Sequence, residues 1–286
     1  MALVRVAEAT DRIGLGTGVA IPSLRHPMVT ASCIAAIEDV APGRLVAGFG
    51  TGFTGRRAMG QVPMKWADLD RYVRDLRRLL RGEVVEIDGA ACQMIQSPGF
   101  GPERPIGVPL LLAPMGPKGF GVARDIADGV FLAQVPSEGL DQQWKYRALS
   151  VQGTVLDPDE DHNSPRVQSA AGPAFLTGYQ GVWEWSTAGV DSMPGGGEWR
   201  ARIEAERPEH ERHLVVHEGH LVAITDRDRP NLDFAGPALL DTGWTGTAAA
   251  IQDRMDSAGA AGINEVVFAL AGDITQELQR IAAVVL

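Results

Sequence analysis

The chain has few of the features that mark secreted, membrane or nucleic-acid-binding proteins. Its two cysteines, Cys33 and Cys92, are too few and too far apart for a disulfide framework or a metal knuckle. Basic residues are also scarce: 26 Lys and Arg stand against 36 Asp and Glu, and the net charge of −10 disfavours nucleic acid or an anionic membrane as a partner. No apolar run approaches the roughly 20 residues of a membrane helix. Charged residues from Arg5 onward disfavour a signal peptide. We therefore expect a cytoplasmic protein with reduced thiols.

Hydrophobic and charged residues are present in ordinary proportions, 45% and 22% of the chain. The length of 286 residues allows one α/β barrel or two smaller domains. Apolar runs of strand length alternate with helical patterns, which predicts a mainly parallel sheet. The predicted strands are 12–19, 44–49, 108–113, 129–133 and 263–270, and the predicted helices are 2–10, 28–40, 67–80, 247–258 and 274–286. A small hairpin is expected at 82–93, turning at Asp88-Gly89.

The middle of the chain, residues 137–242, has a looser pattern. We predict another strand within 167–179, a mostly helical segment at 183–206 and partial helix at 210–229. Residues 157–165 and 230–243 are predicted to form loops.

The most informative stretch runs from Val108 to Phe131, with the sequence VPLLLAPMGPKGFGVARDIADGVF. Its pattern predicts a strand, a tight turn, a helix and a second strand. Gly116 tolerates any backbone angle, and Pro117 suits the first position of a helix. The free N–H groups of the first turn, the helix dipole and Lys118 would together attract a phosphate. The alternative is an ordinary strand-to-helix turn with a solvated lysine.

Three stretches together resemble one family, the luciferase-like monooxygenases and their deazaflavin-dependent relatives such as methylenetetrahydromethanopterin reductase. They begin RIGLGTGVAIPSLRHPMV, MKWADLDRYVRDLRRLL and PLLLAPMGPKGFGVARDIADGV, and the closing GINEVVFALAGD resembles the last unit of the family. The resemblance implies an α/β fold of the TIM-barrel (β/α)8 type. It also implies a single domain over 1–286, with 137–242 as its variable substrate region.

The resemblance further implies a cofactor, the deazaflavin coenzyme F-420 or alternatively FMN, at the carboxyl ends of the strands. In this family the strand that resembles 12–19 ends in a bulge, often with a non-proline cis peptide, that backs the ring system. In this chain that position is Gly18-Val19. Gly50, Thr51 and Gly52 would lie along the ring edge or the ribityl chain. Met115, Gly116, Pro117 and Lys118 would take the phosphate.

The chain departs from the family pattern in two respects. Two βα units that usually precede the helix at 2–10 are absent, so about six barrel strands are expected in place of eight. Those units carry an acid or a histidine that often assists catalysis. Some F-420-dependent dehydrogenases also have a glutamate where this chain has Phe53. We therefore predict no catalytic residue. Either the chain is a fragment or mis-started, or the barrel closes in another way.

Two further motifs have competing interpretations. Gly50 to Gly55 matches the G-x-G-x-x-G pattern of a nucleotide-binding loop, but Pro63 and a predicted loop separate it from the next long helix, which disfavours that interpretation. Four histidines, at positions 210, 213, 217 and 220, would share one face of a helix. A zinc site is conceivable there, but HEGH is not H-E-x-x-H, so we expect a solvated or pocket-lining face and no metal.

The remaining candidates concern substrate and tail binding. Arg56 and Arg57 are either solvated or contact the acidic polyglutamate tail of F-420, which FMN lacks. Trp183 and Trp185 lie in the region where this family builds its substrate pocket.

Three functions are compatible with these observations. The first is an F-420-dependent oxidoreductase that transfers a hydride to or from a small organic substrate. The second is an FMN-dependent monooxygenase that uses molecular oxygen. The third is a non-catalytic barrel remnant or partner subunit. Because an open sheet edge exposes unpaired strand groups, we also expect a homodimer.

Overall fold

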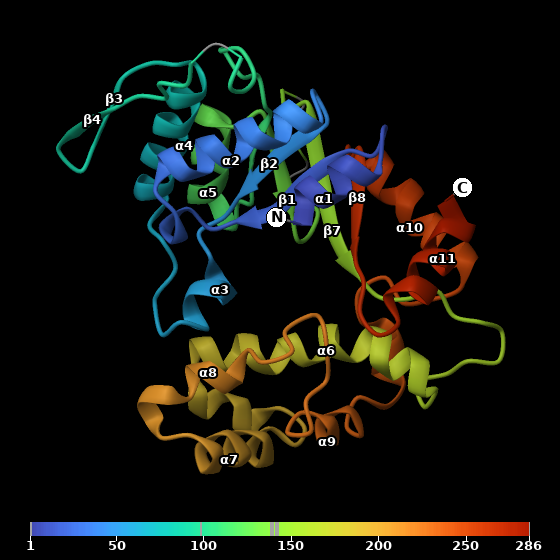
Figure 1. Cartoon of the computed structure of the whole chain (residues 1–286). Coiled ribbons are helices and arrows are strands. Elements are labelled where there is room, and N and C mark those ends of the chain that lie inside the picture. Colours follow the sequence, from blue (N-terminus) through green and yellow to red (C-terminus); the bar gives the residue numbers. More distant parts are fainter. Residues whose placement is uncertain (1, 98, 138–139, 141–142, 286) are drawn as a thin grey trace. The chain divides into compact units, whose positions relative to one another are not determined.

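A computed structural model describes residues 2–97, 99–137, 140 and 143–285. The chain divides into two compact units (Figure 1). Unit 1 comprises residues 1–55, 62–132 and 141–148, and unit 2 comprises 56–61, 133–140 and 149–286.

Unit 1 is built on parallel strands. The strands are β1 (Leu15–Ala20), β2 (Leu45–Phe49), β5 (Leu110–Leu112) and β6 (Gly129–Leu132), in that order, followed by the first half of β7 (Tyr146–Gln152). The pairs β1–β2, β2–β5 and β5–β6 are all parallel. All three residues of β5 are buried, which explains its unbroken apolar sequence LLL. The predicted α/β class with a parallel sheet is therefore confirmed.

Three helices pack beside one another on this sheet: α2 (Pro27–Val40), α4 (Trp66–Leu80) and α5 (Gly116–Ile126) (Figure 1). The apolar residues Leu69, Val73 and Leu76 of α4 recur at helical intervals and are fully buried, as the helix predicted from their spacing requires. Its opposite face carries ion pairs such as Arg74 with Asp70. Helix α1 (Ala2–Ala9) packs on α2, and a short 3-10 turn, η1 (Pro22–Leu24), follows β1.

The predicted hairpin is present as β3 (Val85–Ile87) and β4 (Ala90–Cys92). Asp88 and Gly89 both have positive φ, at 51° and 78°, as a two-residue hairpin turn requires.

Unit 2 contains the second half of β7 with its neighbour β8 (Glu265–Ala269), and the helices α10 (Ala248–Ala260) and α11 (Ile274–Val285). The other elements of unit 2 are helical: α6 (Pro165–Trp185), η2 (Thr187–Ser192), α7 (Gly196–Glu206), η3 (Glu209–Glu211), α8 (His213–Val216), α9 (Arg229–Leu232) and η4 (Gly236–Asp241).

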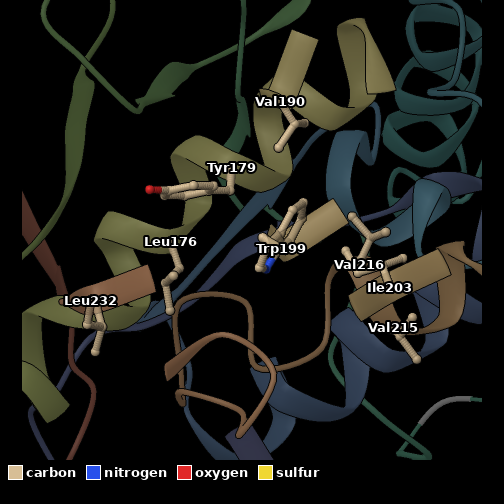
Figure 2. Close-up of a cluster of buried hydrophobic side chains, with 8 residues drawn as sticks. All are labelled: Leu176, Tyr179, Val190, Trp199, Ile203, Val215, Val216 and Leu232. Carbon is tan, nitrogen blue, oxygen red and sulfur yellow. The ribbon is translucent and has the colours of Figure 1, made fainter. Parts of the chain in front are cut away.

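The helical part of unit 2 has its own apolar core, shown in Figure 2. Tyr179 of α6 and Trp199 of α7 are each about 1% exposed, and their ring centroids lie 5.8 Å apart. Ile203 of α7 and Val216 of α8 complete the cluster from the other side. Burial of each such side chain contributes roughly 1.5–3 kcal/mol, so the core accounts for the packing of these short helices.

One prediction for the middle of the chain is wrong, and one strand there was not predicted. The segment 167–179, predicted to contain a strand, lies within the 21-residue helix α6, because its alanine and leucine positions follow the helical period and Pro165 opens the first turn. Strand β7 was not predicted, because YRALSVQ mixes charged and apolar residues without a continuous apolar run. Among the described residues, no helix has the length and apolarity that spanning a membrane requires.

Candidate functional site

The carboxyl end of β1 contains the irregularity predicted for it. The peptide bond between Gly18 and Val19 is cis, and the register between β1 and β2 shifts between Thr17 and Ala20. The Thr17 hydroxyl donates to the Gly48 carbonyl and accepts from the Gly48 N–H, at 2.8 and 2.9 Å. The bulge and the cis peptide are therefore confirmed at the position expected from the resemblance.

Gly50 follows β2 directly and lies against the bulge. Its N–H donates to the Ala20 carbonyl at 3.1 Å. A Cβ at position 50 would lie 2.8 Å from Cγ2 of Val19 and 3.7 Å from the Ala113 side chain. Three adjacent strands, β1, β2 and β5, therefore meet here through Val19, Gly50 and Ala113.

The predicted loop at residues 50–60 is partly helical. Helix α3 (Phe53–Arg57) begins immediately after Gly52, whose φ of +78° makes glycine the natural residue for this turn. The Thr51 carbonyl accepts from the Met64 N–H at 2.9 Å, which closes the loop on itself. Both Thr51 and Gly52 are thus fixed by backbone geometry.

The predicted phosphate turn lies at the start of α5. Gly116 has a φ of +72°, and Pro117 occupies the first turn, where its missing N–H costs no hydrogen bond. Met115 and Lys118 are exposed. Met115 is the N-cap residue, and its side chain makes no capping hydrogen bond. A Cβ at Gly116 would meet no described atom within 4 Å. The free N–H groups, the open space and the lysine charge suit a phosphate.

Helix α5 is held in place at this end by α4. A Cβ at Gly119 would lie 2.6 Å from the Trp66 indole, so the glycine permits this close packing. This packing fixes the first turn of α5.

A cavity of about 440 Å³ in unit 1 was not predicted. It is lined by residues 22–27, which follow β1, and by Met64, Arg71 and Tyr72 among others. The predicted cofactor residues do not line it. The position of residues 22–27 directly after a barrel strand was the available signal.

The four histidines do not share a helix face. Helix α8 ends at Val216, and Gly219, with a φ of +73°, interrupts the segment. His210 is exposed, whereas His217 is buried and its Nε2 is hydrogen bonded to Glu184 Oε1 at 2.8 Å. Sequence reasoning missed Glu184, because a glutamate between two tryptophans on a helix gives no signal of its own.

His220 is partly buried beside His217, with ring centroids 5.9 Å apart. Burial, and secondly the neighbouring His217, lower the pKa of His220 from 6.5 to about 4. Its Nδ1 is hydrogen bonded to Oε1 of Gln180. His220 is therefore neutral at pH 7.

Arg57 forms a salt bridge with Glu184, and its side chain is 25% exposed. Arg57 is therefore an ion-paired and only partly exposed residue. Its predicted contact with a polyglutamate tail stays a prediction.

The two tryptophans of the middle region have different environments. Trp183 packs edge-on against Trp199 with ring centroids 5.8 Å apart, and Trp185 is 82% exposed. Trp183 therefore belongs to the apolar core of unit 2. Among the described residues, no group of three or more His, Cys, Asp or Glu side chains is arranged to hold a metal ion.

Comparison with known proteins identifies curated relatives that match parts of the chain. An F420-dependent glucose-6-phosphate dehydrogenase from Beutenbergia cavernae is 35% identical over 134 residues, which are 43% of this chain and 38% of the dehydrogenase. A 5,10-methylenetetrahydromethanopterin reductase from Methanolobus tindarius is 30% identical over 163 residues, 55% of this chain and 48% of the reductase. The chain thus matches less than half the length of these curated relatives.

Solved structures show the same fold at low identity. The F420-dependent tetrahydromethanopterin reductase of Methanopyrus kandleri aligns with a TM-score of 0.58 and 18% identity, over 95% of this chain and 81% of its own. An F420-dependent secondary alcohol dehydrogenase in complex with an F420-acetone adduct aligns with a TM-score of 0.61 and 16% identity, over 98% of this chain and 81% of the dehydrogenase. A monooxygenase from Streptomyces bottropensis aligns with a TM-score of 0.55 and 18% identity, over 98% of this chain and 80% of the monooxygenase.

The family model for luciferase-like monooxygenases matches residues 2–265, which is most of the chain. The parallel strands, the bulged end of β1 and the turn before α5 agree with this match. The chain belongs to the luciferase-like monooxygenase family.

Proposed function

We propose that this protein is an F-420-dependent oxidoreductase that transfers a hydride to or from a small organic substrate. The glucose-6-phosphate dehydrogenase of Beutenbergia cavernae, 35% identical over 134 residues, is named as F420-dependent, which supports this proposal. The observation that supports the proposal best is the meeting of Val19, Gly50 and Ala113 at the carboxyl ends of three parallel strands, where barrel enzymes bind their ligands.

The chain's own residues would position the cofactor. Gly18 and Val19 would back the ring system, and Gly50, Thr51 and Gly52 would follow its edge or ribityl chain. Met115, Gly116, Pro117 and Lys118 would hold the phosphate at the open first turn of α5. When bound, F-420 supplies the hydride chemistry, and the protein contributes orientation and exclusion of water.

Lys118→Ala tests the phosphate site. A charge-assisted hydrogen bond to phosphate contributes about 1.5–3 kcal/mol, so we expect F-420 to bind at least tenfold more weakly. The intrinsic fluorescence of F-420 reports the dissociation constant. Lys145→Ala is the control, because Lys145 is also exposed but precedes β7 at the amino-terminal side of the strands. Equal affinities of wild type and Lys118→Ala would contradict the assigned phosphate site.

The second candidate is an FMN-dependent monooxygenase. The structural likeness to the Streptomyces bottropensis monooxygenase supports it at the level of the fold alone. F-420 and FMN share a phosphate, so the same turn would serve either cofactor. The two cofactors differ in the acidic tail, which F-420 has and FMN lacks.

We further propose that the chain acts as one cytoplasmic barrel domain that forms homodimers. Strands β1 and β8 are the two ends of the strand order, and pairing of such edges between subunits would satisfy their backbone groups. Size-exclusion chromatography with light scattering tests the dimer, and a monomeric mass at micromolar concentration would contradict it.

A further inference from the structure

Two cavities of unit 1 have no role in the proposed function. The larger, of about 440 Å³, is lined by the turn 22–27, by α4 and by the hairpin. The smaller, of about 70 Å³, is lined by α2, β1 and β2, and its walls are mostly apolar. Arg25 lines both cavities, and the residues proposed to bind the cofactor line neither. A polar cleft that adjoins a small apolar pocket is a typical arrangement for binding a small molecule.

Arg25 is held where the two cavities meet by the backbone of its turn. Its N–H donates to the Pro22 carbonyl at 3.1 Å, and both Pro22 and Pro27 are buried. The next residue, His26, accepts from the Met28 N–H through Nδ1 at 3.1 Å, which fixes the start of α2. The Arg25 guanidinium has no ion pair or hydrogen bond among the described residues. Its planar fork is therefore available to a carboxylate.

The hydroxyls of Thr30 and Tyr72 connect the two cavities. They lie 2.6 Å apart, and Thr30 lines the smaller cavity whereas Tyr72 lines the larger. The two residues are only 9% and 8% exposed, and burial raises the pKa of Tyr72, so the phenol keeps its proton. Two hydroxyl hydrogens share one hydrogen bond, so one of them has no acceptor among the described residues. Because buried polar groups are normally paired, this hydrogen indicates an oxygen of a bound ligand.

The larger cavity also contains carboxylates without a partner. Asp75 follows Tyr72 by three positions on α4 and lies on the same face, and Asp88 lies at the hairpin turn. Neither carboxylate has an ion pair or hydrogen bond among the described residues. Asp68, in contrast, is paired with Arg71 at 2.7 Å. The unpaired charges on the described walls are thus one cation and two anions.

These charges discriminate between simple ligands. A carboxylic acid anion would satisfy Arg25 but would meet an excess of negative charge. An amine cation would be repelled by Arg25 and would leave the hydroxyl hydrogen without an acceptor. A zwitterion satisfies both signs. The smaller cavity adds room for about two to three carbon atoms of an apolar group.

We propose that unit 1 binds a small aliphatic α-amino acid at this place. The carboxylate pairs with Arg25 and accepts the hydrogen of the Thr30–Tyr72 pair. The ammonium group pairs with Asp75, and the alkyl side chain enters the smaller cavity, which Cys33 also lines. This site goes beyond the proposed function and does not depend on which cofactor the chain binds.

The first test uses wild-type protein and its two cysteines, with L-valine as the probe. Cys33 lines the smaller cavity, whereas Cys92 lies on β4 and lines neither cavity. Alkylation of each thiol by iodoacetamide is followed by mass spectrometry. At ten times the dissociation constant of L-valine, Cys33 should react about tenfold more slowly, because about a tenth of the protein is then unoccupied. Cys92 should react at an unchanged rate. An unchanged rate for Cys33 would overturn the proposal.

Calorimetry with three analogues tests each part of the ligand. 3-Methylbutanoate lacks the ammonium group, 2-methylpropan-1-amine lacks the carboxylate and glycine lacks the alkyl side chain. Each should bind about tenfold or more weakly than L-valine, because each loses a charge-assisted contact or a buried apolar group. Any analogue that binds as tightly as L-valine would contradict the assigned zwitterion site.

Two variants test the charged residues. Arg25→Gln and Asp75→Asn should each weaken L-valine binding about tenfold or more, because each removes one ionic partner. The matched controls are Arg5→Gln on α1 and Asp39→Asn on α2, which are exposed, line neither cavity and should bind as wild type does. Wild-type affinity in Arg25→Gln would overturn the proposal. Should a variant not fold, the alkylation of wild type still decides.

The outcome is independent of the proposed function. None of these measurements includes F-420 or FMN, so a chain that binds L-valine but no cofactor would contradict only the proposed oxidoreductase. A chain that binds F-420 but not L-valine would contradict only the amino-acid site.

Discussion

The Phe131 ring lies close to Gly18 because Gly18 has no side chain. A Cβ at position 18 would lie 2.8 Å from Cζ of that ring, closer than real contacts allow. The absence of a side chain thus allows the end of β1 and the aromatic residue of β6 to approach.

Gly18→Ala should therefore destabilise the protein by roughly 1–3 kcal/mol, as overpacking of a closely packed site does. Urea unfolding followed by circular dichroism measures this change. Gly121→Ala is the matched control, since Gly121 lies within α5 with open space around it and should gain about 0.5–1 kcal/mol from helix propensity. A neutral effect of Gly18→Ala would contradict the close approach.

His220 makes stability depend on pH in a predictable direction. Its folded pKa of about 4 lies below the ordinary 6.5, so the unfolded chain binds more protons than the folded chain between these values. The stability that results is fully present above pH 6.5 and is lost as the pH falls toward 4.

Between pH 7 and pH 4 the free energy of unfolding should fall by about 2 kcal/mol less in His220→Asn than in wild type. This value is smaller than the full pKa shift would give, because His220 is partly exposed to solvent. Urea unfolding at both pH values provides the comparison. His210→Asn should behave like wild type, because His210 is exposed. Identical acid sensitivity of His220→Asn and wild type would show that His220 is not the group responsible.

Among the elements, α7 buries its one tryptophan in the core of unit 2. Trp199 is 1% exposed, contacts the rings of Tyr179 and Trp183, and donates from its indole N–H to Asp228 at 2.6 Å. Figure 2 shows it in the centre of the core cluster of unit 2.

Trp199→Phe should lower the free energy of unfolding by about 2–4 kcal/mol, because it both leaves a cavity and removes the donor from the buried Asp228. Trp185→Phe, at a position that is 82% exposed, should change it by less than about 0.5 kcal/mol. Thermal and urea unfolding distinguish the two. Equal effects would mean that the cluster does not stabilise α7.

The elements that the sequence predicted correctly have simple periods. α4 and β5 were found because Leu69, Val73 and Leu76 follow the helical repeat and Leu110 to Leu112 are uniformly apolar. β7 was missed because Arg147 interrupts its apolar pattern, and the helical nature of 167–179 was hidden by glycine and Pro173 inside α6. Short helices held by tertiary packing leave little local signal.

At the scale of the whole molecule, the sequence alone could locate the residues predicted to bind the cofactor but not the Glu184–His217 pair. The bulge at Gly18-Val19 and the turn at Gly116 were predictable because local sequence and family resemblance point to the same positions. The Glu184–His217 pair was not, since its two members lie 33 positions apart and are joined only by folding.

The central claim concerns the cofactor, and a direct competition titration tests it. Wild-type protein is titrated with oxidised F-420 and separately with FMN, following the fluorescence of each, and one cofactor is then displaced by the other. We predict micromolar binding of F-420 that FMN displaces only weakly, because the acidic tail of F-420 adds contacts that FMN lacks. Tight binding of FMN with no binding of F-420 would contradict the account and favour the monooxygenase.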